Sequence, residues 1–462
     1  MMPSKAESSA KTKAGLSITF DTLLKSRNEA ATELLLDALS AATDEIQDAA
    51  LEALLKRRTI AGHRQLLLRL PMLAPRQRAI VAANHHRLGR VVRDAILSRD
   101  DAEFARGSEV AAEFRDYETL PTLLQVAEDG SNAHRESAAG YILQLAEALY
   151  QELAAPRAIV VQRDPQLMRT HVLHSLEHSV VRYSQHRRTE IVEAFLLLSP
   201  RENPLLVRIL GNPMDAAYLP VIDMLTHSTR GGIVRLVLSY LDDPCAPSSI
   251  LTVMSRRSDP KFLENFLHRL GSQASAVVNQ NLKRINALSW MENQVKLVDS
   301  FDVIAQQGAV HLARTSSIQR GVAYNLIEHL MRRGKTEGRQ AAAAALASFH
   351  GADANRLVCD CLRDPDPVVQ SHLIGQLRSR GTPGALQTLL SMLDHPHEVV
   401  RAAARRNLEE FSFDRYLTAF EMLDERVRRD TGPVVRKVDP TAPKRLAEEL
   451  DARSRTRRMR GV

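Results

Sequence analysis

Scarce cysteine, scarce aromatic residues and the lack of long apolar runs set the first limits on this chain. Three cysteines among 462 residues are too few for a disulfide framework, and the N-terminal stretch MMPSKAESSAKTKAGLS has no apolar segment of the kind that a secretory signal needs. Charged residues interrupt every leucine-rich segment before it reaches the roughly eighteen apolar residues of a membrane-spanning helix. We therefore expect a cytoplasmic protein that does not enter a membrane.

Aromatic residues make up only 4% of the chain and there is one tryptophan, whereas hydrophobic residues as a whole reach 44%. Ala, Leu and Arg are abundant, and these residues favour helices over strands. The composition therefore argues against a β-rich body and predicts a helical one with enough apolar material for a large core.

The net charge of +7 suggests nucleic acid, but its distribution weakens that inference. Residues 1–14 carry a charge of +2 and residues 436–462 carry +5, so residues 15–435 are neutral. We predict a disordered N-terminal tail over 1–14, a folded body over 15–435, and a basic, largely flexible tail over 436–462 that begins after the break Thr431-Gly432-Pro433.

The clearest internal repeats lie late in the chain. DPDPVVQSHLIGQL (364–377) aligns with HPHEVVRAAARRNL (395–408), and position 395 follows position 364 by 31 residues. Within each unit two segments have apolar residues at helical spacing, with a polar turn containing proline between them. Each unit is therefore a helical hairpin, which buries its apolar face only by stacking on its neighbours. The offset predicts these equivalent interior positions: Ile327, Val358 and Leu389 in the first helices, and Leu346, Leu377 and Leu408 in the second.

The segment LLSMLDHPHEVVRAAARRNLEEF resembles a HEAT repeat, with its Asp/Pro turn, paired valines and following arginine. The resemblance is clearest over 327–411, with weaker echoes before it. It implies an all-α, right-handed superhelical solenoid of HEAT-like (armadillo-like) helical hairpins, roughly ten to twelve of them over 15–435. In this family Asp and Arg form ladders between neighbouring repeats, which Arg339 and Arg401 could join; Gln370, at the equivalent position, departs from the pattern.

The string His174-Ser-Leu-Glu177-His178 is the most enzyme-like motif, since it fits the H-x-x-E-H pattern of inverted zinc peptidases, with His171 one turn upstream. At 100° per residue, however, His171, His174 and His178 share the polar side of a helix whose other side is apolar. The same residues are therefore either a solvated stripe or a weak candidate metal site.

Other catalytic motifs are missing. There is no G-x-G-x-x-G, no Walker A sequence and no G-x-S-x-G, so we expect neither an enzyme nor a cofactor. Cys359 and Cys361 have the wrong spacing for a zinc or redox pair, and we expect Cys359 to be a small core residue.

From Ala53 to Arg93 there is no acidic residue, while ten Lys and Arg side chains give a charge of +10. The segments on both sides, 16–52 and 94–152, are strongly acidic. These arginines could neutralise the acidic helices stacked beside them, or they could face a ligand. For the second interpretation we predict a binding patch of His86, Arg87, Arg90 and Arg93 on one helix face, since guanidinium groups bind phosphates and carboxylates alike.

The C-terminal run ends in several arginines, among them Arg455, Arg457 and Arg458, which would be either a solvated tail or a second part of the binding patch. Two functions remain in competition: a scaffold that binds a protein partner, for which an acidic partner would suit the arginines, and a nucleic-acid-binding solenoid that uses 53–93 and the tail. The resemblance adds two remoter options, a HEAT-like DNA glycosylase and an accessory role similar to the HEAT-like bilin lyases, but no residue speaks for either.

Overall fold

A computed structural model of the chain describes residues 18–41, 43–156, 164–271 and 274–461, and within these ranges the secondary structure is helical, without a β-strand. The chain divides into two compact units, Met1–Tyr240 and Leu241–Val462. The tail predicted over 1–14 lies outside the described residues. Within the described ranges every helix falls short of the length and apolarity that crossing a bilayer demands.

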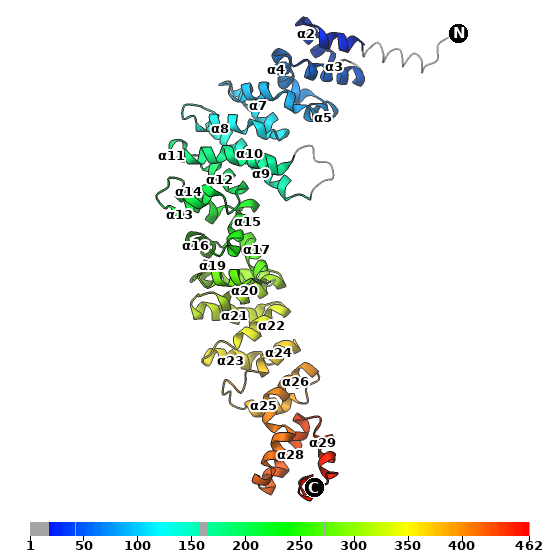
Figure 1. Ribbon diagram of the computed structural model, residues 1–462, viewed down its shortest axis with the longest axis vertical. Helices are drawn as coiled ribbons and strands as arrows, with labels where there is room; N and C mark the ends of the chain where they lie inside the picture. Colours follow the sequence, from blue (N-terminus) through cyan, green and yellow to red (C-terminus); the bar gives the residue numbers. More distant parts are fainter. Residues whose placement is uncertain (1–17, 42, 157–163, 272–273, 462) are drawn as a thin grey trace, which may run out of the picture. The chain divides into compact units, whose positions relative to one another are not determined.

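The first unit is a stack of helical hairpins (Figure 1). The helices of this unit form two layers. In one layer α4 packs on α6 and α6 on α8, and in the other α7, α9, α12 and α15 pack on one another in chain order. The bounds are as follows: α2 Ala30–Ala38, α3 Asp44–Arg57, α4 Ile60–Arg69, α5 Pro75–Ala83, α6 Gly89–Ile96, α7 Asp101–Glu113, α8 Leu120–Glu128, α9 Arg135–Ala154, α10 Pro165–Val181, α11 Tyr183–His186, α12 Thr189–Leu198, α13 Pro204–Gly211, α14 Tyr218–His227 and α15 Gly231–Ser239.

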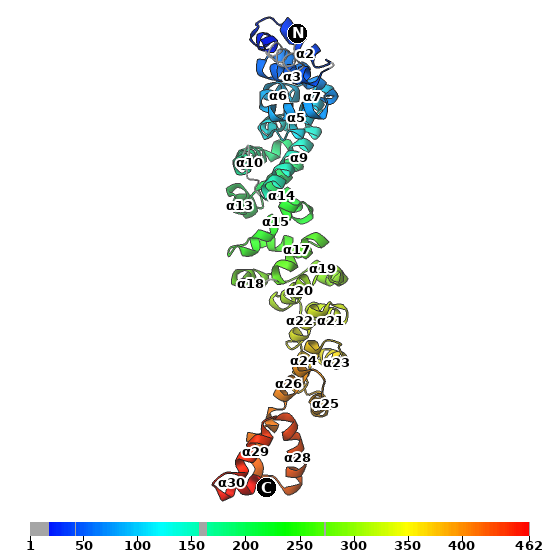
Figure 2. The same ribbon diagram turned by 90° about the vertical axis from the view of Figure 1, so that its right-hand side faces the viewer.

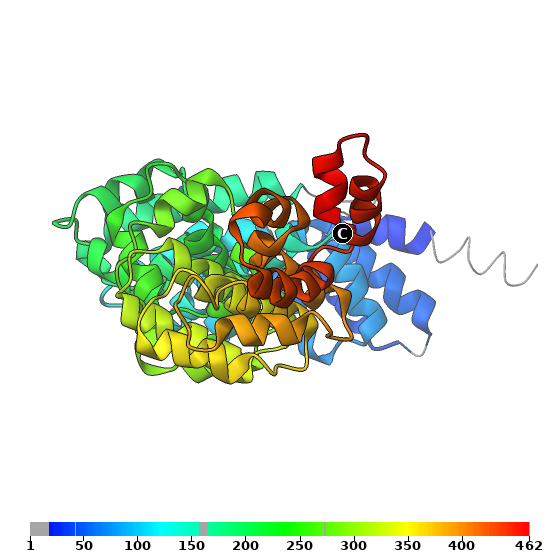
Figure 3. The ribbon, with the colours of Figure 1, turned by 90° about the horizontal axis from the view of Figure 1, so that it is seen from below.

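The second unit repeats this plan. Figure 2 shows α21, α23 and α25 on one side and α22, α24 and α26 on the other, and in the view from below the yellow and orange helices of this unit lie over one another (Figure 3). The bounds are as follows: α16 Ser248–Arg256, α17 Pro260–Gly271, α18 Ala276–Leu282, α19 Ser289–Asn293, α20 Val303–Thr315, α21 Arg320–Arg333, α22 Thr336–Leu346, α23 Ala352–Cys361, α24 Pro367–Ile374, α25 Ala385–Met392, α26 Glu398–Asn407, α27 Phe413–Ala419, α28 Glu425–Val438, α29 Ala442–Leu450 and α30 Arg455–Gly461.

The interior positions predicted from the 31-residue offset are confirmed. All six side chains are buried, three in first helices and three at the ends of second helices: Ile327, Val358, Leu389, Leu346, Leu377 and Leu408. Leu389 and Leu408 belong to one apolar cluster with residues of α24 and α28. The seam between successive hairpins is therefore continuous through this region, as stacking of repeats requires.

The side chains at positions 339, 370 and 401 each donate a hydrogen bond to the loop that precedes their own helix. Arg339 donates to the carbonyl of Gly334, Gln370 to that of Asp364, and Arg401 to those of the turn before it. Arg339 also forms a bidentate contact with Asp364 of the next hairpin, at 2.9 Å, so its predicted ladder contact is confirmed. Arg401 pairs instead with Glu398 of its own helix, and its predicted ladder contact is wrong.

The Asp366 side chain caps the N-terminus of α24. Its carboxylate accepts hydrogen bonds from the backbone N–H groups of Val368 at 2.8 Å and Val369 at 3.0 Å, which are otherwise unsatisfied at a helix start. Burial raises the pKa of Asp366, but the hydrogen bonds from Val369 and from the Gln340 side chain outweigh it and hold this pKa below its ordinary value.

We expect Asp366→Ala to lower the free energy of unfolding of the second unit by about 1 kcal/mol at neutral pH. Because the pKa of Asp366 is depressed in the folded state, this contribution is present above the unfolded pKa of about 3.9 and is lost as pH falls through the folded pKa. Urea titrations at about pH 7 and pH 3 measure it. An exposed acid in the first turn of α23, Asp353, makes no capping bond, so Asp353→Ala is the control, and an equal loss in both variants would refute the capping role.

Helices α17 and α20 cross at two glycines. A Cβ on Gly308 would lie 1.8 Å from the carbonyl oxygen of Leu267, and one on Gly271 would lie 2.1 Å from that of Ile304. Real Cβ atoms do not approach backbone this closely, so the crossing exists only because both residues lack a side chain. The close contact joins two successive hairpins of the second unit.

The break predicted at Thr431-Gly432-Pro433 is wrong, since α28 continues through Pro433 to Val438. Proline inside a helix costs about 3 kcal/mol, but Val435 and Val438 beyond it are buried, Val435 against Phe413 and Ala442. Their burial keeps the helix intact past the proline. Within the predicted tail, Ala442–Leu450 form α29 and Arg455–Gly461 form the short helix α30. The mobility of the basic tail stays a prediction.

Candidate functional site

Most of the basic block over 53–93 is used inside the molecule. Arg64 pairs with Glu103, Arg76 with both Asp44 and Asp48, and Arg78 with Glu113. Lys56 pairs with Glu52 in its own helix. Arg57 and Arg69 donate to backbone carbonyl groups of the preceding hairpin. Three of these six residues, Arg64, Arg76 and Arg78, pair with acids of neighbouring helices, as the first interpretation of the block predicts. The other three are held by backbone carbonyl groups or by an acid of their own helix.

The four residues of the predicted binding patch lie on two short segments and not on one helix. Helix α5 ends at Ala83, His86 and Arg87 belong to a 3₁₀ turn (His85–Arg87), and only Arg90 and Arg93 are on α6. Within the described ranges none of the three arginines forms an ion pair with a carboxylate. Arg90 is exposed, and Arg87 and Arg93 are half-buried. Together with the exposed Arg58, these arginines are the part of the block that internal pairing leaves over.

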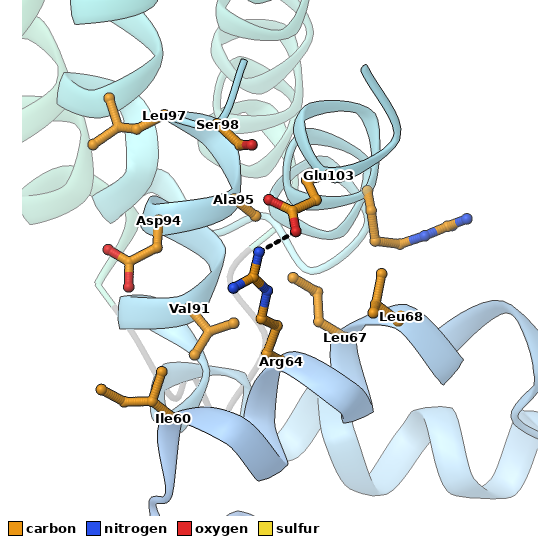
Figure 4. A pocket seen from close by; sticks show the side chains of 11 residues that line it. Ile60, Arg64, Leu67, Leu68, Val91, Asp94, Ala95, Leu97, Ser98 and Glu103 are labelled. Atoms are coloured by element: carbon orange, nitrogen blue, oxygen red, sulfur yellow. Dashed lines mark hydrogen bonds and ion pairs between the residues drawn. The ribbon is translucent and has the colours of Figure 1, made fainter. Parts of the chain in front are cut away.

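A pocket opens beside this patch, between α4, α6 and the start of α7 (Figure 4). Its volume is about 230 Å³. Figure 4 shows Arg64 of α4 reaching across to Glu103 of α7, with aliphatic side chains on both sides. The lining residues come from all three elements: Ile60, Arg64, Leu67, Leu68, Val91, Asp94, Ala95, Leu97, Ser98, Glu103 and Arg106. We call this cavity the α4–α6 pocket.

The ion pair in the α4–α6 pocket fixes the charge of its polar side. The hydrogen bond with Glu103 raises the pKa of Arg64, and the same bond lowers the pKa of Glu103. Both groups therefore stay charged at any physiological pH, and together they add no net charge. Asp94, exposed on α6, also favours the charged form of Arg64.

His63 is a buried histidine of α4, the helix that also carries Arg64 of the pocket. Burial lowers the pKa of His63, and the positive charges of Arg58 and Arg87 lower it further. Its Nε2 atom lies 3.2 Å from the carbonyl oxygen of Leu54, which ties α4 to α3. His63 is therefore a neutral structural residue around pH 7, and the positive charge near it comes from the arginines alone.

A second, wider groove of about 450 Å³ runs along the exposed face of α9 in the first unit. Gln144 and Gln151 are exposed along it, and Gly140 leaves open space at one end. Arg115 and Arg230 flank the groove, but each is held by acids: Arg115 by Glu152, and Arg230 by acids of α9 and α12. Its charged residues thus serve to join neighbouring helices.

The histidine stripe lies on α10 as predicted, with all three side chains exposed and Val172 and Leu176 buried on the other side. The Nε2 atoms of His174 and His178 are 3.2 Å apart, whereas the Glu177 carboxylate accepts a hydrogen bond from Asn203. Among the described residues no group of three or more potential ligands is placed to hold a metal ion. The Glu177 carboxylate is thus engaged by Asn203, whereas the peptidase motif needs this carboxylate free to activate a water.

The C-terminal arginines are partly used within the second unit. Arg457 pairs with Glu449 of α29, and Arg458 donates to two carbonyl groups of the turn before α30. For Arg455 no contact of this kind is present within the described residues. Only part of this predicted site therefore remains open to a ligand.

Cys359 is exposed on α23, so its prediction as a core residue is wrong. This helix buries Ala354, Leu357 and Val358, and the next position on that face is Cys361, which is half-buried. Burial raises the pKa of the Cys361 thiol, which therefore stays protonated at neutral pH.

A family model described as HEAT repeats matches residues 324–409. This match covers the three hairpins whose interior positions were predicted from the 31-residue offset. Residues 324–409 are HEAT repeats. Outside this HEAT region the chain has the same all-α solenoid architecture of stacked hairpins within each unit. None of the curated proteins matches the chain at a significant level.

The solved structures to which the chain is similar include two of Kap121p and one of an engineered protein. A Kap121p mutant is 14% identical with a TM-score of 0.23, and Kap121p bound to Nup53p is 13% identical with a TM-score of 0.22. Each of these matches covers 96% of this chain but only 44% of Kap121p. An engineered protein is 15% identical with a TM-score of 0.22, over 82% of this chain and 98% of its own.

Proposed function

We propose that the chain is a non-catalytic, cytoplasmic scaffold that binds a protein partner along its stacked hairpins. The observation that carries this proposal is the α4–α6 pocket, whose rim exposes large aliphatic side chains beside charged ones. Exposed apolar groups around a concavity, rimmed by polar residues, are typical of protein-binding sites. The cytoplasmic location rests on the three free cysteines, which fit a reducing compartment.

A second candidate is nucleic-acid binding, which the arginines without carboxylate partners favour. Arg87, Arg90 and Arg93 could contact phosphates, but six other basic residues of the block are held inside the molecule. Three phosphate contacts give weak affinity that falls steeply with salt. The aliphatic rim beside them has no role in such binding, and this makes a protein partner the better candidate.

The two candidates are separated by purification of the full chain from its native cell after nuclease treatment, followed by reconstitution from purified components. We expect a protein that still binds at about 0.5 M salt, with affinity reduced less than about tenfold from 0.15 M, because apolar contacts are little screened. If only DNA or RNA binds, with affinity lost by orders of magnitude over the same range, the scaffold proposal is wrong.

A further inference from the structure

Two histidines of α10 face each other across one turn of the helix. The Nε2 atoms of His174 and His178 lie 3.2 Å apart, and their rings meet edge to face with centroids 4.5 Å apart. Positions i and i+4 of a helix are neighbours on its surface, and both side chains are exposed, whereas Val172 and Leu176 on the other side are buried. This α10 histidine pair is therefore held together by the helix and open to solvent.

The distance between these two nitrogen atoms fits a shared metal ion. An imidazole nitrogen binds Zn²⁺ at about 2.0–2.1 Å. Two such bonds that meet at the tetrahedral angle of about 109° place their nitrogen atoms about 3.3–3.4 Å apart, and two that meet at about 90° place them about 2.8–3.0 Å apart. The observed 3.2 Å lies between these values. Both nitrogen atoms are thus placed to reach one ion without a change in the backbone of α10.

Without a metal, the contact is a hydrogen bond between two imidazole rings. Because both rings are exposed, water can satisfy each nitrogen atom separately, and a hydrogen bond of this kind contributes little to stability. Carboxylates do not occupy the pair either. Among the described residues, the histidines that pair with a carboxylate are His134, His227, His268 and His329. Both Nε2 atoms of the α10 histidine pair are therefore available to a ligand that binds them more strongly than they bind each other.

Other neighbouring histidines lack this geometry. The ring centroids of His395 and His397 are 5.6 Å apart, and those of His85 and His86 are 6.3 Å apart. The imidazole of His171, one turn before the α10 histidine pair, has no hydrogen bond or ring contact with either member within the described residues. No third ligand is placed beside the pair in the described part of the chain, so a metal site here has two protein ligands.

We propose that His174 and His178 bind one divalent transition-metal ion of the kind that imidazole prefers, Zn²⁺, Ni²⁺ or Cu²⁺, through their Nε2 atoms. Each ring then keeps its proton on Nδ1, so a neutral pair releases no proton on binding. Two protein ligands fill only part of the shell of the ion, and water or another ligand takes the remaining positions. The bound ion links two successive turns of α10 and makes this helix harder to open. The site lies apart from the α4–α6 pocket and does not depend on the scaffold function.

The test uses the full chain without a polyhistidine tag, freed of metal by a chelator and titrated with ZnCl₂ or NiCl₂ in isothermal titration calorimetry. We expect a site for one ion per chain whose affinity falls at least about tenfold in His174→Ala and in His178→Ala, because the loss of either ligand removes the chelate. Hydrogen exchange of the α10 amide groups should slow when metal is added to the unchanged protein, but not in either variant. Mg²⁺, which prefers oxygen ligands, should have neither effect.

Two matched controls each remove an exposed imidazole and leave the pair intact: His171→Ala in α10 itself and His397→Ala in the second unit. Both should bind metal as the unchanged protein does, and circular dichroism verifies that every variant is folded. Three results would overturn the proposal: neither Zn²⁺ nor Ni²⁺ binds, the ion binds His174→Ala and His178→Ala with unchanged affinity, or either control weakens binding as much as these variants do. None of these results bears on the scaffold function, which the native partner tests.

Discussion

Substitution of Gly308 by alanine is expected to lower the free energy of unfolding of the second unit by more than about 3 kcal/mol, at the upper end of overpacking effects. The added methyl group would lie 1.8 Å from the carbonyl oxygen of Leu267 and 3.0 Å from the backbone nitrogen of Gly271. Neither atom belongs to a flexible side chain, so α17 and α20 must separate to admit it. Urea unfolding monitored by circular dichroism, with hydrogen exchange of α17 and α20, measures the loss.

The control is Gly321→Ala in the same unit. Gly321 is in α21, and a Cβ there would have no atom within 4 Å. Inside a helix alanine is more favourable than glycine by about 0.5–1 kcal/mol. This variant should therefore be as stable as the unchanged protein or slightly more stable. A Gly308→Ala protein that unfolds at the same urea concentration as Gly321→Ala would show that the close crossing is not needed.

Replacement of Leu377 by alanine should cost about 2–5 kcal/mol, because it leaves a cavity in the seam between two HEAT hairpins. Leu377 is buried, and the equivalent residues Leu346 and Leu408 are buried in the hairpins on either side. We expect Leu346→Ala to have a loss of similar size, and urea unfolding of the second unit measures both.

Leu386 provides the comparison, since it is 43% exposed on α25 close in sequence to Leu377. Leu386→Ala should change the free energy of unfolding by no more than about 0.5 kcal/mol, as surface substitutions do. If Leu377→Ala and Leu386→Ala lower the free energy of unfolding by the same amount, the buried position of Leu377 in the seam does not stabilise the unit, and the prediction is wrong.

The sequence was sufficient to predict the hairpins and their seam, because apolar spacing and the 31-residue offset depend only on local periodicity. It was insufficient at Pro433, where the local preference of proline to end a helix is opposed by the burial of Val435 and Val438 against residues distant in the sequence. It also misplaced Cys359, although the positions Ala354, Val358 and Cys361 already mark the buried face of α23.

The candidate site was predictable only in part. Charge segregation pointed to the region 53–93, and the arginines left without acidic partners include Arg90 and Arg93. The pocket itself was missed, because it depends on how far apart α4 and α6 lie. The run Leu66, Leu67 and Leu68 gave no usable signal, because three consecutive leucines can all be buried, as Leu196, Leu197 and Leu198 of α12 are.

The close crossing of α17 and α20 was also beyond sequence reasoning. Gly308 lies inside α20, where glycine is unfavourable by propensity, whereas Gly271 is the last residue of α17, where glycine is common. The cost at Gly308 was the only indication that another helix passes near. Which helix approaches, and at which residue, is decided by the packing of the whole unit. Glycine within a helix is therefore not by itself a marker of tertiary contact, since Gly140 of α9 and Gly321 of α21 have open space where a Cβ would lie.

The order in which hairpins pack on their chain neighbours bears on how the protein is made. Since within each unit the hairpins pack on their neighbours in the chain, a hairpin can dock as soon as the ribosome releases it, without waiting for a distant segment. Domains generally fold N-terminal first during synthesis, and contacts between residues near in sequence require little loop closure. During synthesis the most recently docked hairpin would expose the apolar face that the next hairpin later covers, and chaperones would be needed at this face.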